Sequence, residues 1–73
     1  MHADAIPLAL RPPMPDTVED ADRRLREVRD ELAAAMVLLG LGHLTPAAYA
    51  RRARHLKDER LGLEAARARL RGA

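Results

Sequence analysis

The fold is decided by Leu39-Gly40-Leu41-Gly42-His43-Leu44-Thr45-Pro46. Glycine adopts the left-handed backbone conformation that closes many helices, and Thr-Pro supplies an N-cap followed by a proline at the first helical position. The stretch therefore predicts a helix stop followed by a helix start. Because the chain on both sides has a helical pattern, we expect an antiparallel helical hairpin with its bend at residues 40–45.

The segment before the bend carries a heptad pattern. Its apolar positions alternate between spacings of three and four residues, as in the seam of a coiled coil. These positions are Val18, Ala21, Leu25, Val28, Leu32, Ala35 and Leu39. Asp16 and Glu19 have the spacing of a capping box, with Asp16 as the N-cap, so we predict a first helix over residues 16–40.

A second helix is predicted over residues 46–71, with Thr45 as its cap. Four large apolar side chains recur every seven residues, and the positions between them are smaller or charged. The large ones are Tyr49, Leu56, Leu63 and Leu70, and the intervening ones are Ala53, Arg60 and Arg67. This stripe is narrower and more polar than that of the first helix.

Charge is divided between the two segments. Residues 16–40 carry seven acidic and four arginine side chains, a net charge of −3, whereas residues 41–73 carry eight basic and three acidic side chains, a net charge of +5. Opposite charge favours packing the two helices side by side, through pairs that flank the seam.

Residues 1–15 hold four of the five prolines, which excludes a regular helix there and predicts an extended, proline-rich arm. Ile6, Leu8 and Leu10 alternate along it, as in a segment that lays one face on an apolar surface. Three alternatives remain open for this arm: a disordered leader, a strap folded back along the first helix, and a short motif for a partner protein.

The composition indicates that the hairpin does not act alone. The chain has 73 residues, no cysteine and one aromatic side chain, and its apolar fraction of 48 % is largely alanine and leucine. A single hairpin of this composition has a thin core. We therefore predict an all-α protein that forms a homodimer, as a four-helix bundle, or a larger oligomer, or that binds a partner protein.

The expected contact surface lies at the bend, where both helices are apolar around most of their circumference. A helix that is apolar on every side needs cover on every side. The residues assigned to this surface are Met36, Val37, Leu38, Leu41, Leu44 and Tyr49. The leading hypothesis is thus a small binding, adaptor or regulatory protein that acts through this end.

The alternative is a nucleic-acid-associated protein. The dense basic cluster of the second helix offers phosphate contacts through Arg51, Arg52, Arg54 and Lys57. Against this alternative, the basic cluster contains no aromatic side chain for base stacking and the net charge of the chain is only +2. We consider it more plausible that these cations form a solvated face that pairs with acidic residues of the first helix.

No enzyme is expected. The adjacent carboxylates of Asp30 and Glu31, or of Asp58 and Glu59, point in different directions on a helix. His55 and Glu59 share a face at a spacing that suits a metal, but two ligands do not make a site. We predict no catalytic residue, metal or cofactor.

Source and location are suggested by composition alone. The bias toward arginine and alanine is typical of bacterial or phage genomes with high GC content. No apolar run is long enough to span a membrane, and the first ten residues lack a basic start and contain Pro7 within their apolar patch. We expect a cytoplasmic protein without a membrane partner.

The bend region, residues 39–56, resembles the short helical domains called SHOCT. The resemblance rests on the pattern Leu39, Gly42, Leu44, Thr45, Tyr49 and Leu56. Ala48 stands where those domains usually carry an acidic residue. The same stretch is similar to helical coiled-coil segments of large serine recombinases. Both resemblances imply a two-helix element for protein contact or oligomerisation, and no activity.

Overall fold

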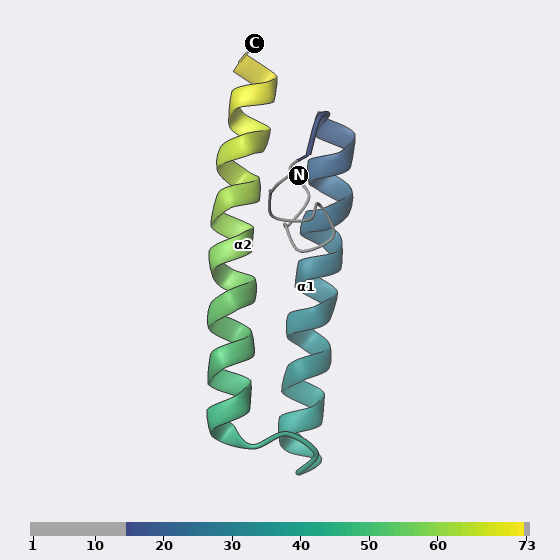
Figure 1. The fold of residues 1–73 in the computed structure, drawn as a ribbon. Coiled ribbons are helices and arrows are strands. Elements are labelled where there is room, and N and C mark those ends of the chain that lie inside the picture. The colour runs from purple at the N-terminus through teal and green to yellow at the C-terminus, as the bar shows by residue number, and fades with distance from the viewer. Residues whose placement is uncertain (1–14, 73) are drawn as a thin grey trace, which may run out of the picture.

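The computed structural model describes residues 15–72, and the chain forms two α-helices there. Helix α1 spans Val18–Gly40 and helix α2 spans Pro46–Gly72. They run antiparallel and side by side, joined by a short bend at one end (Figure 1). The predicted all-α helical hairpin is confirmed. The predicted arm falls, apart from Pro15, outside the described residues.

Helix α1 begins later than predicted. The side chain of Thr17 accepts a hydrogen bond from the backbone N–H of Asp20 at 3.0 Å, so Thr17 is the N-cap and Val18 the first helical residue. The assignment of Asp16 as the cap is therefore wrong by one residue. Both residue types make good caps, and the sequence pattern does not distinguish two adjacent ones.

Helix α1 ends in a Schellman motif. Gly42 adopts a φ of +80°, its N–H donates to the carbonyl of Leu39 at 3.1 Å, and the N–H of His43 donates to the carbonyl of Leu38 at 2.9 Å. These two bonds satisfy carbonyls that the helix end leaves open. The left-handed residue is thus Gly42, while Gly40 is the last residue of the helix.

Helix α2 begins where the sequence predicts. The hydroxyl of Thr45 accepts a hydrogen bond from the N–H of Ala48 at 3.1 Å, and Pro46 is the first helical residue. Proline costs nothing there because that backbone N–H has no partner within the helix.

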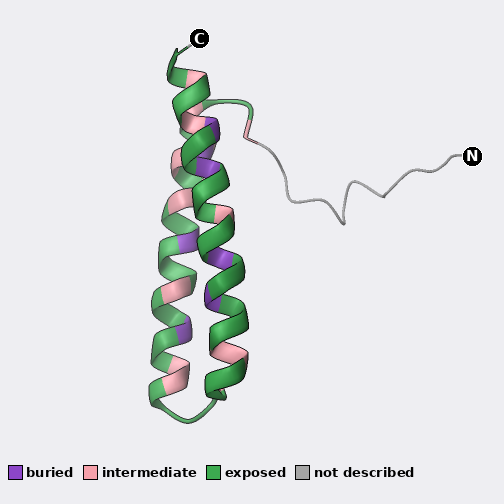
Figure 2. Cartoon of the chain, turned by 90° about the vertical axis from the view of Figure 1, so that its left-hand side faces the viewer, coloured by how far each residue is buried: buried purple, intermediate pink, exposed green. Residues whose placement is uncertain are grey.

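The core is a single line of contacts between the two helices. Val28, Leu56 and Leu63 are buried together, and Leu25 and Leu32 pack against them while remaining partly exposed. Small buried side chains extend this line along both helices, namely Ala21, Ala35, Ala53 and Ala66. Figure 2 shows the buried residues confined to the facing sides of the two helices.

The predicted stripe of α2 needs one correction. Arg60 is exposed and Arg67 only partly buried, whereas Ala66 is buried. A straight helix drifts by about 20° per heptad relative to a strict seven-residue repeat. Toward the end of α2, Ala66 therefore faces α1, and Arg67 lies at the edge of the contact between the helices.

The bend yields a stability prediction. Gly42→Ala should lower the free energy of unfolding by about 1 kcal/mol, because an L side chain is strained at positive φ. Gly40→Ala should raise it by about 0.5 kcal/mol, since alanine is the better helix former. An added Cβ meets nothing within 4 Å at either glycine, so the pair isolates backbone conformation. Urea denaturation followed by circular dichroism measures both, and a Gly42→Ala variant as stable as the native chain would contradict this account of the bend.

Candidate functional site

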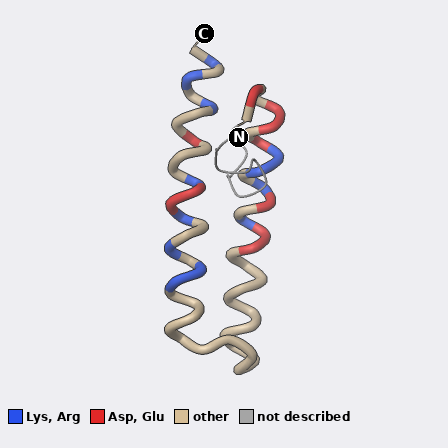
Figure 3. Tube along the Cα trace, in the orientation of Figure 1, with Lys and Arg blue, Asp and Glu red and all other residues tan. Residues whose placement is uncertain are grey.

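The bend end of the hairpin carries no charge. Residues 32–50 contain no lysine, arginine, aspartate or glutamate, and they form the last turns of α1, the bend and the first turns of α2. Figure 3 shows charged residues gathered along the rest of both helices and absent from this end. The two segments meet because the chain reverses between them, so one end of the molecule lacks charge on both helices.

Three of the six residues predicted for the contact surface are strongly exposed. Met36 is 61 % exposed, Val37 60 % and Leu41 64 %. Val37 and Leu41 are four positions apart and lie on one face, with Met36 beside them. We call Met36, Val37 and Leu41 the bend-end surface.

The other three predicted surface residues, Leu38, Leu44 and Tyr49, are partly buried. Their side chains therefore contribute both to the hairpin and to its exterior. A substitution at any of them would disturb folding as well as binding, whereas the bend-end surface can be altered with the fold intact.

Leu61 is the one further large apolar side chain that is strongly exposed within the described residues, at 61 %. It lies on α2 outside the charge-free segment, between Arg60 and Gly62. Isolated exposed leucines are ordinary on protein surfaces. Leu61 therefore serves as a control position for substitutions in the bend-end surface, because its exposure equals that of Met36 and Val37.

The four predicted phosphate contacts lie along the first half of α2, three of them on one side of the helix. Arg51, Arg52, Arg54 and Lys57 are all exposed, and none forms an ion pair with another residue of the described range 15–72. At about 100° per residue, Arg52 and Arg54 point to nearly opposite sides of the helix. The expected pairing of these cations with α1 does not occur. Arg51, Arg54 and Lys57 are spaced three residues apart and lie within about 120° on one side of α2, whereas Arg52 lies outside that side.

The two helices are instead joined by an ion pair that their net charges do not predict. Arg24 of α1 donates two hydrogen bonds to Glu59 of α2, from Nε to Oε2 at 2.6 Å and from Nη2 to Oε1 at 2.9 Å. Its remaining terminal nitrogen donates to Glu27 at 3.1 Å and to Glu31 at 2.7 Å. One arginine thus holds three carboxylates, and it belongs to the helix with the negative net charge.

A second ion pair joins the helices near their open end. Arg67 of α2 donates to Asp22 of α1 at 3.0 Å, and both side chains are 34 % exposed. In this pair the acidic residue is on α1 and the basic residue on α2, as the net charges of the helices predict. In the pair of Arg24 and Glu59 the basic residue is on α1 and the acidic residue on α2.

The hydrogen bonds of Arg24 shift the titration of both partners. They lower the pKa of Glu59 below its ordinary value, against the opposing effect of burial. They raise the pKa of Arg24, chiefly through Glu59. With side chains 29 % and 18 % exposed, Arg24 and Glu59 are the most sheltered of the ion pairs between described residues.

Within residues 15–72, no three histidine, aspartate or glutamate side chains are arranged so that they could hold a metal ion. Glu59, which shares a face with His55, is engaged by Arg24. In the same range no helix is both long enough and apolar enough to cross a membrane.

The chain matches no protein-family model, and searches of the curated proteins and of the solved structures find no significant similarity. The resemblance to SHOCT domains therefore stays a prediction. What can be inferred about function comes from the surfaces of the hairpin itself.

The shifted carboxylate predicts a pH dependence. Because the pKa of Glu59 is lower in the folded than in the unfolded chain, its contribution to stability is present above pH about 4.5 and is lost as the pH falls through the folded pKa. Glu59→Gln should lower the free energy of unfolding at pH 7 by about 1.5–3 kcal/mol, the range for a hydrogen bond to a charged group. It should also flatten the loss of stability on acidification.

Urea denaturation at several pH values tests this, with Asp58→Asn as the matched control. Asp58 is the neighbouring carboxylate, is exposed and has no ion pair among the described residues. Asp58→Asn should change stability by less than about 0.5 kcal/mol. Equal losses in the two variants at pH 7 would show that Arg24 does not stabilise the hairpin through Glu59.

Proposed function

We propose that this chain is a small, non-catalytic protein-binding or adaptor protein with a regulatory role, which acts through its bend-end surface. The surface holds a second copy of the chain, a partner protein, or both. A cytoplasmic location is part of this proposal.

The observation that carries this proposal is the charge-free end with its three exposed apolar side chains. Charged residues are depleted at the centres of protein interfaces, because burying an unpaired charge is costly. Covering the bend-end surface removes apolar area from water and desolvates no charged side chain. Each large apolar side chain that becomes fully buried contributes about 1.5–3 kcal/mol.

Self-association at this end fits the charges of the molecule. A homodimer places a surface against its own copy, so a charged surface of one sign would repel itself. The bend end is the part of the described hairpin where two copies meet without that repulsion. A four-helix bundle formed around the last turns of α1 would also cover the partly exposed Leu38 and Tyr49.

The nucleic-acid alternative has one observation in its favour, which is that Arg51, Arg52, Arg54 and Lys57 are exposed and unpaired among the described residues. Arg51, Arg54 and Lys57 share one side of α2, where they can contact one phosphate backbone, whereas Arg52 lies off that side. Such binding would fall steeply with salt, whereas binding at the uncharged end would not.

The test compares Val37→Asp with Leu61→Asp. Both native side chains are about equally exposed, so both variants should fold with nearly native stability. The short aspartate cannot carry its charge out of a covered surface. Val37→Asp should therefore reduce the mass of the purified protein, or abolish salt-resistant capture of a partner from nuclease-treated lysate, while Leu61→Asp changes neither.

Light scattering over a range of concentrations gives the mass, and chemical denaturation confirms that both variants are folded. A mass and a capture that survive Val37→Asp would overturn the proposal. So would bound material that nuclease or high salt removes, which would transfer the function to the basic residues of α2.

A further inference from the structure

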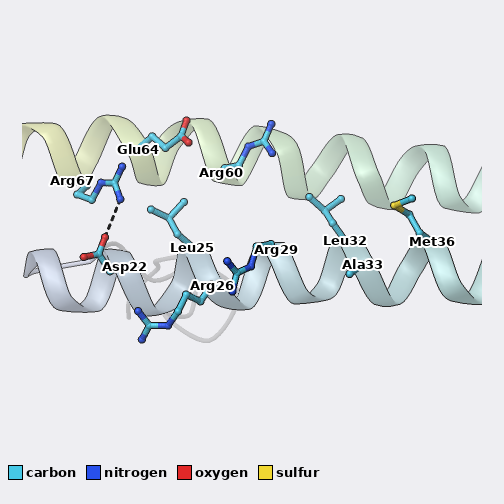
Figure 4. A pocket seen from close by; sticks show the side chains of 10 residues that line it. All are labelled: Asp22, Leu25, Arg26, Arg29, Leu32, Ala33, Met36, Arg60, Glu64 and Arg67. Carbon is cyan, nitrogen blue, oxygen red and sulfur yellow. Dashed lines mark hydrogen bonds and ion pairs between the residues drawn. The ribbon is translucent and has the colours of Figure 1, made fainter.

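A groove runs along one side of the hairpin, between α1 and α2, with a volume of about 670 Å³. Its floor is formed by Leu25, Leu32 and Met36, which point from α1 toward α2 (Figure 4). Leu25 and Leu32 belong to the core contacts yet stay partly exposed, because two helices cover only part of each other. The groove is therefore a part of the apolar core that the two helices leave exposed to solvent.

The rim of this groove is positively charged. Four arginines and two carboxylates line it, a net charge of +2. Arg67 pairs with Asp22, and Arg29 approaches only the exposed Asp30, at 3.8 Å, which is longer than a hydrogen bond. Arg26 and Arg60 form no ion pair with another residue between positions 15 and 72. Arg26, Arg29 and Arg60 thus lie exposed beside an apolar floor.

We propose that this groove binds an acidic amphipathic helix of a partner protein, which completes a three-helix bundle. The partner's aliphatic side chains would cover Leu25, Leu32 and Met36, and its glutamates or aspartates would face Arg26, Arg29 and Arg60. From Asp22 to Met36 the groove follows α1 for about 21 Å, which corresponds to about fourteen residues of a docked helix.

A second copy fits this groove poorly. Symmetric docking would bring the arginine-lined rim against itself, and Arg29 near the middle of the groove would approach its own equivalent. A phosphate backbone fits poorly as well, because it would leave the apolar floor uncovered. Charge and apolar floor together favour a helix that is acidic on its flanks and aliphatic between them.

This inference does not depend on the bend-end surface. Val37 and Leu41 do not line the groove, and Met36 is the residue that the two surfaces share. Val37→Asp therefore serves as a variant that removes the bend-end surface and should leave binding in the groove unchanged.

The experiment uses the full chain and three labelled synthetic helical peptides of about fourteen residues. The first has leucines at helical spacing flanked by glutamates, the second has every glutamate replaced by lysine, and the third has every leucine replaced by alanine. Fluorescence anisotropy should show binding of the first peptide, and affinities at least about tenfold weaker for the other two.

Arg29→Glu and Arg54→Glu make the same charge change inside and outside the groove. Arg29→Glu should weaken binding of the acidic peptide at least about tenfold, whereas Arg54→Glu should change it less than about threefold, through the net charge alone. Equal weakening by both variants would reveal non-specific attraction and overturn the proposal.

Three further outcomes would also overturn it. The first is that the acidic peptide fails to bind. The second is that a single-stranded oligonucleotide displaces the peptide at a lower concentration than the unlabelled peptide does. The third is that the native chain forms a homodimer that Arg29→Glu dissociates. The second result would assign the rim to phosphates, and the third would assign the groove to a second copy.

Discussion

The packing of Val28 against Leu56 and Leu63 is the contact on which the rest of the hairpin depends. Two helices bury only the stripe along which they touch, and here that stripe holds three large side chains and four alanines. Alanine contributes little apolar area, so the contact stabilises the fold by a small margin. Interactions at the edges of the stripe consequently matter more than they would in a larger domain.

The pair of Arg24 and Glu59 is the strongest of these edge interactions. Its two parallel hydrogen bonds fix the distance and the register between the two helices, because the planar guanidinium binds a carboxylate in few orientations. Arg24 also holds Glu27 and Glu31 on its own helix. Arg24 therefore engages two carboxylates of α1 together with Glu59 of α2, whereas Arg26 and Arg29 of the same helix line the groove.

Sequence patterns were sufficient for the parts of this fold that depend on local geometry. The glycines of the bend, the Thr45-Pro46 start and the heptad of α1 each predict structure within a few residues, and the hairpin follows from them. The bend-end surface could be predicted for the same reason, since residues apolar around a whole helix cannot all face one partner. Three of the six residues named for it are strongly exposed in the structure.

Features that depend on the register between the helices could not be predicted. The net charge is negative on α1 and positive on α2. A net charge does not reveal a single ion pair in which the basic residue is on α1 and the acidic residue on α2, such as Arg24 and Glu59. The burial of Ala66 in place of Arg67 has a similar origin, in a drift of the straight helix that a seven-residue count ignores. The groove likewise depends on the register between the helices, because its rim combines residues of α1 with Arg60 and Arg67 of α2.

The two exposed surfaces differ in what would make binding specific. At the bend end, affinity depends on apolar area and shape, which change little with salt, and many apolar partners satisfy such a surface equally well. In the groove as proposed, the arginines would repel basic partners and attract acidic ones over a distance of about 8 Å at physiological salt. Under the two proposals, the chain holds itself or a partner at one end and discriminates among acidic helices along its side. Assembly and selection would then use two separate surfaces of the same hairpin, with Met36 as the residue they share.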